Sequence, residues 1–401
     1  MTYRYDQIFD YPYHKLPLVL GESPYEGDRI SMHIGEPTVP PPSFVQDAIN
    51  QNSHLWTKYP HALGTIEYRE TVATWMGQRY PGLAGKVDPV TELSASAGSK
   101  EALFLSAITA VMRKEKMLKG KQPVVMTPSP AYHVYYGAGL SAGAETIPYG
   151  LYKENNFAPD WDSFPKEQLE RLAIFYLCTP NNPIGSILSK ADLQKAIKVA
   201  REYDFILGVD ECYSELFYDE APTGSLEAAE ELGDHFKNVI CYNSLSKRSG
   251  AAGLRVGFVA GDAEFMKGFA IMRGYGAPQV PTPLQAAAIV LWKDEDHVEK
   301  GRAFYQESLN ALGQQIADLP GYTRPEGGFF VWFDAGENQG DELARKIWKE
   351  QGMQVLPGSI MSQKDPITGK LPGANYIRLA AIYEPDKMSE VGRRLRTSVL
   401  G

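Results

Sequence analysis

Cysteine is scarce in this 401-residue chain, which contains only Cys178, Cys212 and Cys241. Each stands in or beside an apolar, strand-like run, and three thiols cannot all pair. We therefore expect buried thiols and no disulfide framework, as is typical of a reducing compartment. The seven histidines show no metal-ligand spacing and no CxxC pair is present, so the sequence gives no sign of a metal site.

Positive charge and long apolar runs are also missing. The formal net charge of −9 argues against nucleic acid or an anionic membrane surface as a partner. The longest apolar run, Ala286–Trp292, is far too short to cross a bilayer, and Met1–Leu20 contains no apolar signal core. There is no Walker sequence ending in GK[ST] and no internal repeat. We expect a cytoplasmic protein.

What is present is an alternation of strands and helices. Apolar runs predict strands at Val124–Met126, Leu172–Cys178, Phe205–Val209 and Val239–Tyr242. Helical spacing predicts helices at Ile66–Tyr80, Lys100–Lys114 and Lys190–Tyr203, and another that begins at Ser43, whose hydroxyl can cap it. Nearly continuous apolar strands separated by helices indicate a mostly parallel sheet that is covered on both faces.

The sequence pattern changes toward the C-terminus. The pattern there predicts a smaller α+β domain made of a helix Asp296–Asp318, a strand Gly327–Phe333, a helix Asp341–Gln351, a strand Tyr376–Leu379 and a helix Asp386–Val399. We divide the chain into an N-terminal arm (1–43) that belongs with the small domain, a large domain (44–290) and the small domain (291–401). The basic run Arg113–Lys121 is expected to be a solvated helix end.

The stretch Ser244–Gly257 holds a lone lysine, Lys247, among small residues. Ser244 and Arg255 flank it as a hydroxyl and a guanidinium, a pair suited to a phosphate. A lysine beside such a pair suits a Schiff base with pyridoxal 5′-phosphate. For any lone lysine, however, a solvated position in a polar turn is the simpler interpretation, so the other parts of a cofactor site must be found elsewhere.

Further segments supply such parts. Asp210 ends a strand and could keep a pyridine nitrogen protonated. Asn182, held between two prolines, and Tyr213 could donate hydrogen bonds to a phenolate oxygen. The segment Gly98-Ser99-Lys100 opens a helix whose free N–H groups suit an anion, and Tyr132 could stack on a planar ring. Taken singly, these features are equally typical of a strand-ending Asp, a turn, an N-cap and core packing.

Taken together, they resemble the fold type I pyridoxal-phosphate enzymes, and among these the class I and II aminotransferases. The resemblance runs from about Gly35 to the C-terminus. Its motifs are a Gly-Ser-Lys-Glu-Ala helix start, an Asn-Asn-Pro-x-Gly loop, Asp-x-x-Tyr, Ser-x-Ser-Lys with an Arg eight residues after the Lys, and Tyr-x-Arg-Leu near the C-terminus. It implies a large domain with a mostly parallel seven-stranded sheet, plus a smaller α+β C-terminal domain.

The resemblance also implies roles for the matched residues. Lys247 forms the Schiff base, with Asp210 and Tyr213 as the other catalytic groups. Gly35, Asn182 and Arg378 contact the substrate, and Arg378 grips its α-carboxylate. The implied contacts to pyridoxal 5′-phosphate are Gly98, Ser99, Lys100, Tyr132, Asn182, Asp210, Tyr213, Ser244, Lys247, Arg255 and, from the neighbouring subunit of a homodimer, Tyr59.

The implied reaction moves an amino group between an amino acid and a keto acid, with glutamate and 2-oxoglutarate as the shared pair. Tyr11–Leu16, Ile34–Pro37, Leu245–Ser249 and Leu254–Asp262 resemble the N-succinyl-diaminopimelate aminotransferases of lysine biosynthesis. Aspartate-type and broad-range aminotransferases stay open as alternatives. A C–S β-lyase or a non-catalytic sensor on the same fold is less favoured.

Two positions remain ambiguous in sequence. Arg273 either binds a distal carboxylate of the substrate or is a surface or helix-capping residue. Gly276 stands near a position where many relatives have a Ser or Thr that touches the partner's phosphate, which puts a second contact of that kind in doubt.

Overall fold

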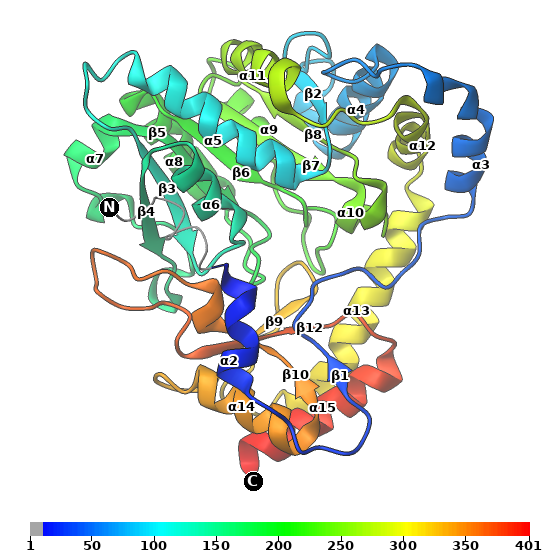
Figure 1. The fold of residues 1–401 in the computed structure, drawn as a ribbon, viewed down its shortest axis with the longest axis vertical. Coiled ribbons are helices and arrows are strands. Elements are labelled where there is room, and N and C mark those ends of the chain that lie inside the picture. Colours follow the sequence, from blue (N-terminus) through cyan, green and yellow to red (C-terminus); the bar gives the residue numbers. More distant parts are fainter. Residues whose placement is uncertain (1–10) are drawn as a thin grey trace.

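The computed structural model describes residues 11–401, whose largest element is one sheet (Figure 1). Its seven strands pair in the order β2-β8-β7-β6-β5-β3-β4. Their bounds are β2 Leu93–Ser96, β3 Val124–Ser129, β4 Glu145–Gly150, β5 Leu172–Cys178, β6 Ile206–Asp210, β7 Val239–Ser244 and β8 Gly257–Gly261. β8 runs antiparallel to both neighbours, whereas every other pair is parallel. The predicted mostly parallel sheet is confirmed.

Helices cover both faces of the sheet because successive strand side chains are apolar on both sides. In β3, Val124 and Met126 face one apolar cluster, and Val125 faces another. The first cluster is closed by α3 Phe44–Gln51, α4 Ile66–Arg79, α8 Lys190–Tyr203, α9 Ser225–Glu231 and α12 Thr282–Lys293. The second is closed by α5 Ser99–Glu115, α6 Val134–Ser141 and α11 Ala263–Gly276.

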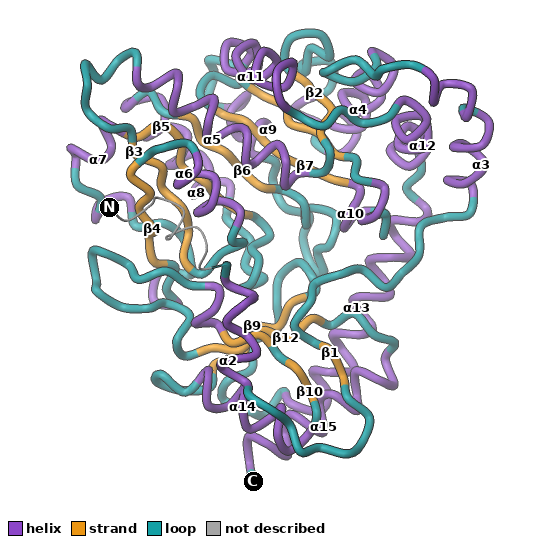
Figure 2. The backbone as a smooth tube through the Cα atoms, viewed as in Figure 1, coloured by secondary structure: helices purple, strands orange, loops and turns teal. Residues whose placement is uncertain are grey.

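A second body of structure lies below the large sheet in Figures 1 and 2. Its three strands, β9 Phe330–Asp334, β11 Leu356–Pro357 and β12 Tyr376–Ala380, form an antiparallel sheet. Its helices are α13 Asp296–Ile316, α14 Gly340–Gln351 and α15 Pro385–Leu400. The N-terminal arm joins it: in α2 (Leu16–Leu20) Leu16 and Leu20 enter its core, and β1 (Ile30–Ser31) pairs with β10 (Met353–Gln354). Residues 1–10 of the expected arm lie outside the described part.

Short helices complete the described chain. They are α7 Lys166–Arg171, α10 Leu245–Arg248, η1 Pro12–Lys15, η2 Ser53–Thr57, η3 Pro81–Leu83, η4 Lys153–Asn155, η5 Trp161–Ser163, η6 Ala252–Leu254 and η7 Gly358–Met361. Within residues 11–401, no helix has both the length and the apolarity needed to cross a bilayer. The three cysteines are buried and free, as expected.

Some local expectations were wrong. Ser43 already has helical backbone angles, φ −60° and ψ −31°, and its hydroxyl makes no capping hydrogen bond. The run Arg113–Lys121 is a helix end with Lys116, Lys119 and Lys121 exposed, as predicted, but Lys114 is buried, and its amine donates to the carbonyl oxygens of Tyr203 and Asp204 at 2.9 and 3.1 Å. The predicted strand at Gly327 begins only at Phe330, because Gly328 has a φ of +72° and cannot continue an extended strand.

One buried cation anchors α10, the short helix that carries Lys247. The Arg248 guanidinium carbon lies 5.0 Å from the ring centroid of Trp292 and 5.5 Å from that of Trp75. Its side chain is fully buried, pairs with the Glu295 carboxylate and donates to the Leu291 carbonyl at 2.8 Å. Arg248 therefore links α10 to the end of α12.

We predict that Arg248→Met lowers the midpoint of urea unfolding, with a loss of at least about 2 kcal/mol, because two indole contacts and a buried hydrogen bond are removed. The matched control is Arg396→Met, whose pair with Asp318 is solvent-exposed. That change should move the midpoint much less, because solvent screens an exposed ion pair. Equal midpoints for the two variants would contradict this assignment of Arg248.

Candidate active site

A cavity of about 490 Å³ lies where the carboxyl ends of β5, β6 and β7 meet the small domain and the arm. Ligands of parallel sheets bind at such edges, because the loops that leave the strands converge there. The lining includes these residues expected from the sequence: Gly35, Ser99, Lys100, Tyr132, Asn182, Asp210, Tyr213, Lys247, Arg255 and Arg378.

Lys247 lies at the centre of this set. Its amine donates to the Gly35 carbonyl oxygen at 2.5 Å and lies 5.4 Å from the ring centroid of Phe329. Burial lowers the pKa of Lys247 to about 8, and the positive charges of Arg378 and Arg255 act in the same direction. At pH ~7 about a tenth of this amine is therefore neutral and nucleophilic, far more than for an ordinary lysine.

Asp210 is buried at the end of β6. Its carboxylate accepts a hydrogen bond from the Tyr135 hydroxyl at 2.7 Å and one from the Cys212 N–H at 3.1 Å. Burial raises the pKa of Asp210, whereas these hydrogen bonds and the charge of Lys247 act against that rise. The carboxylate is thus held in one orientation and would favour a cationic partner.

The start of α5 has the features of an anion site. Gly98 has a φ of +75°, and no side chain caps this helix. Arg255 approaches the same turn and donates to the Ala97 carbonyl at 2.9 Å. A Cβ atom at position 98 would lie only 2.5 Å from Nη2 of Arg255, so this close approach requires glycine.

The two serines of the Ser-x-Ser-Lys motif lie differently. Ser246 lines the cavity, whereas Ser244 is buried behind it, and its hydroxyl accepts from the Ser246 N–H at 3.1 Å. A direct contact of Ser244 with a phosphate stays a prediction. Ser246, Tyr135 and Cys212 were missed from the sequence, although the first is in the motif that identified Lys247.

Arg378 is almost fully buried, yet the described groups that its guanidinium contacts are uncharged. It donates to the Asn182 amide oxygen at 2.9 Å and to the His33 carbonyl at 2.6 Å, and it lies 4.1 Å from the Phe330 ring centroid. Its Nε finds no hydrogen-bond partner among residues 11–401. Such a guanidinium suits an incoming carboxylate, which would supply the missing charge and acceptor.

Tyr132 and Tyr213 supply the aromatic parts of the site. Both line the cavity, Tyr132 from the loop after β3 and Tyr213 from the loop after β6. Burial raises the pKa of both phenols, so both hydroxyls stay protonated and can donate.

Three positions lie away from the cavity. Tyr59 is fully exposed, so no role for it within one chain is visible. Arg273 is buried and pairs with both oxygens of Glu101 at 2.5 and 2.6 Å, and it is therefore neither a surface residue nor free to bind a substrate carboxylate. A Cβ atom at Gly276 would meet nothing within 4 Å.

The residues present fit pyridoxal 5′-phosphate, the cofactor that the resemblance implies. An uncapped helix start and Arg255 suit its phosphate, the fixed carboxylate of Asp210 suits a pyridinium, and the Lys247 amine suits an aldehyde. Among residues 11–401 no cluster of His, Cys, Asp or Glu could hold a metal ion.

Comparisons with known proteins agree with this geometry. The model of the family "Aminotransferase class I and II" matches residues 28–381. An LL-diaminopimelate aminotransferase of Nitratidesulfovibrio vulgaris is 28% identical over 377 residues, which cover 92% of this chain and 91% of the relative.

Solved structures agree as well. An aminotransferase from Neisseria meningitidis has a TM-score of 0.92 and 34% identity, with 99% of each chain covered. A probable N-succinyldiaminopimelate aminotransferase from Thermus thermophilus has a TM-score of 0.79, with 99% of this chain and 100% of the other covered. It is 21% identical, so the likeness is one of fold.

We predict that, in cofactor-free protein, trinitrobenzenesulfonate modifies Lys247 with a rate that is half-maximal near pH 8. Only the neutral amine reacts, and an ordinary lysine reaches that point near pH ~10.4. Peptide mapping after brief labelling measures the rate. Lys247→Ala should remove the labelled peptide, and a midpoint above pH ~10 would contradict the lowered pKa.

Proposed function

Because the chain belongs to the aminotransferase class I and II family and is a pyridoxal-phosphate-dependent aminotransferase, we propose that it transfers an amino group between N-succinyl-LL-2,6-diaminopimelate and 2-oxoglutarate. One observation supports an amino-acid substrate. Arg378 is buried in the same cavity as the Lys247 amine, and among the described residues it has no carboxylate partner. The diaminopimelate skeleton is supported by curated relatives that are 26–29% identical and named LL-diaminopimelate aminotransferase.

We assign the cofactor contacts as follows. The helix start at Gly98-Ser99-Lys100, together with Arg255 and the serines of the motif, binds the phosphate. Tyr132 stacks on the ring, and Asp210, oriented by Tyr135, pairs with the ring nitrogen. Asn182 and Tyr213 donate to the ring oxygen. The cofactor, when bound, supplies an aldehyde for the substrate amine and an electron-withdrawing ring.

The protein's own groups then perform the proton transfers. Arg378 holds the α-carboxylate in a two-point contact, which fixes the Cα–H bond toward Lys247. The amine of Lys247, with its pKa of about 8, takes the proton from Cα and returns it to the carbon on the other side of the substrate nitrogen. Asp210 keeps the ring nitrogen protonated throughout. Water supplies the oxygen of the keto acid that leaves, and a second substrate reverses the steps.

We also propose a homodimer, in a reducing cytoplasm that suits the three free thiols. Large apolar side chains are exposed on η2, on the loop after it and on α11: Trp56 at 52%, Tyr59 at 101%, Ile271 at 59% and Tyr275 at 88%. Exposed aromatic side chains of this kind are typical of subunit contacts. In the dimer, Tyr59 would reach the phosphate of its neighbour.

A second candidate substrate is LL-diaminopimelate without the acyl group, since the curated relatives carry that name. The two candidates share the reacting end and differ only at the far end of the side chain. The same assay therefore separates them.

We predict that glutamate converts the bound cofactor to its amino form, seen as loss of the visible absorbance band. N-succinyl-LL-2,6-diaminopimelate should then be the best donor to 2-oxoglutarate in a panel that includes LL-diaminopimelate, aspartate and aromatic amino acids. Lys247→Ala should show neither the band nor turnover. Release of pyruvate and ammonia from cysteine conjugates, without transamination, would favour a β-lyase instead.

A separate prediction tests the subunit contact. Tyr59→Phe should weaken pyridoxal-phosphate binding about tenfold, the effect of losing one hydrogen bond to a charged group. Sedimentation should still show a dimer. Tyr203→Phe, at the end of α8, is the control and should change neither quantity; unchanged cofactor affinity in Tyr59→Phe, or a monomer in the wild type, would contradict the cross-subunit role.

A further inference from the structure

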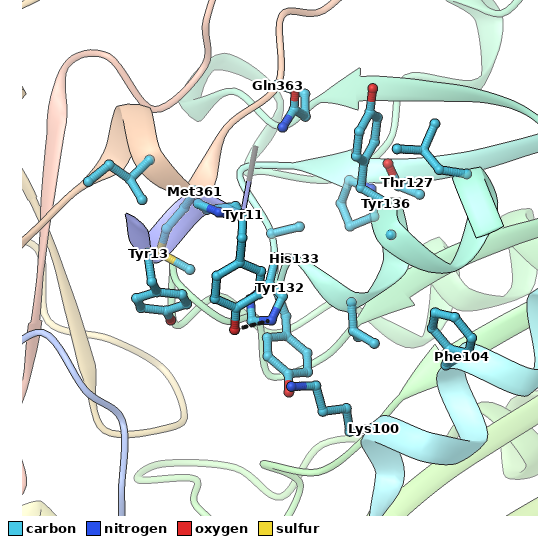
Figure 3. Close-up of a pocket in the computed structure, with 17 residues that line it drawn as sticks. Tyr11, Tyr13, Lys100, Phe104, Thr127, Tyr132, His133, Tyr136, Met361 and Gln363 are labelled. Carbon is cyan, nitrogen blue, oxygen red and sulfur yellow. Dashed lines mark hydrogen bonds between the residues drawn. The ribbon is translucent and has the colours of Figure 1, made fainter. Parts of the chain in front are cut away.

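A second cavity, of about 470 Å³, lies beside the candidate active site (Figure 3). Tyr13, Lys100 and Tyr132 line both cavities. We call the place where these three residues border the active site the mouth of the second cavity. The remaining lining comes from the arm, from α5 and α6, from the end of β3 and the loop after it, and from the segment Ile360–Gln363 of the small domain. None of the roles assigned above uses this space.

The charged side chain among the described residues that line the second cavity is positive. None of the described residues that line it is acidic. Lys100 stands at the mouth, where its amine lies 5.9 Å from the ring centroid of Tyr132. His133 lines the cavity too, but burial and the charge of Lys100 lower its pKa to about 4, so its ring is neutral at pH ~7.

Beyond the mouth, the walls are mostly apolar and aromatic. Phe104, Leu140 and Met361 supply apolar surface. In Figure 3, Thr127, Tyr136 and Gln363 lie at the end away from Lys100, where they offer neutral hydrogen-bonding groups. A long chain with a neutral polar group can be satisfied there, whereas an ammonium group would find a like charge at the entrance and no carboxylate among the described lining residues.

We propose that this second cavity is the side-chain subsite of the enzyme, and that it selects long amino acids whose distal amine is acylated over those whose distal amine is free. The inference rests on the proposed function and deepens it. With Arg378 on the reacting carboxylate, Lys100 pairs with a distal carboxylate at the mouth. The methylene groups of the acyl chain lie along the apolar and aromatic walls, and its terminal carboxylate accepts hydrogen bonds from the side chains of Thr127, Tyr136 and Gln363. Acylation removes the ammonium charge that the cavity cannot accept.

Gly137 allows the cavity to be filled selectively. It belongs to α6 and lines the cavity, and a Cβ atom there would meet nothing within 4 Å. Gly301 is a matched control, because it lies in the helix α13 outside the lining and its Cβ would also meet nothing within 4 Å.

The experiment uses holoenzyme and measures kcat/KM for N-succinyl-LL-2,6-diaminopimelate, LL-diaminopimelate and glutamate. We expect the wild type to prefer the acylated donor over LL-diaminopimelate by at least about tenfold, and Gly137→Phe to lower kcat/KM for the acylated donor by at least about tenfold. Glutamate turnover and the visible absorbance of the cofactor should change little in Gly137→Phe. Gly301→Phe should behave as the wild type, and Lys100→Gln should reduce the preference between the two diaminopimelates.

Other outcomes overturn the proposal. These are a preference for LL-diaminopimelate, no reaction with either diaminopimelate, or unchanged use of the acylated donor by Gly137→Phe, each with glutamate still active. If glutamate does not react, the proposed function itself fails. Calorimetric binding of N-succinyl-LL-2,6-diaminopimelate to wild type and Gly137→Phe then decides the subsite separately: equal affinities reject it, and weaker binding by the variant supports it.

Discussion

Parallel strands that end at one edge of a sheet force their following loops into one place, and this constraint organises the molecule. The loops after β3, β5, β6 and β7 bring Tyr132, Asn182, Tyr213 and Lys247 to one cavity. The sheet core is buried on both faces, so these loops start from fixed points. Arg248, fixed between two tryptophans, holds the helix that carries Lys247 in the same rigid frame.

The electrostatics of the cavity follow from the convergence of these loops. Lys247, Arg255 and Arg378 face one cavity in which Asp210 is the only carboxylate among the described lining residues. Burial, together with these positive charges, lowers the pKa of Lys247, and no residue in the described part of the chain gives Arg378 a charged partner. Anionic ligands, a phosphate and an α-carboxylate, are what such a site stabilises, and their binding offsets the desolvation of the buried cations.

The central part of the site could be predicted from the sequence, because strands are recognisable as apolar runs and chemistry follows their ends. Lys247 and Asp210 were found in this way. Tyr135 was missed because it lies on a helix among apolar residues, and only the fold shows that it contacts Asp210. The strand β8 was missed as well, since Gly257–Gly261 is short and bounded by glycines. Which motif serine faces the cavity depends on the backbone turn at α10, which spacing alone does not encode.

The arm is more than a covering segment. Two backbone carbonyls of one short stretch, those of His33 and Gly35, accept hydrogen bonds from Arg378 and from Lys247. The arm thus offers neutral oxygens to both cations. Binding of the cofactor to Lys247 and of a carboxylate to Arg378 would each replace one of these carbonyls, so the position of the arm and the occupancy of the site are linked.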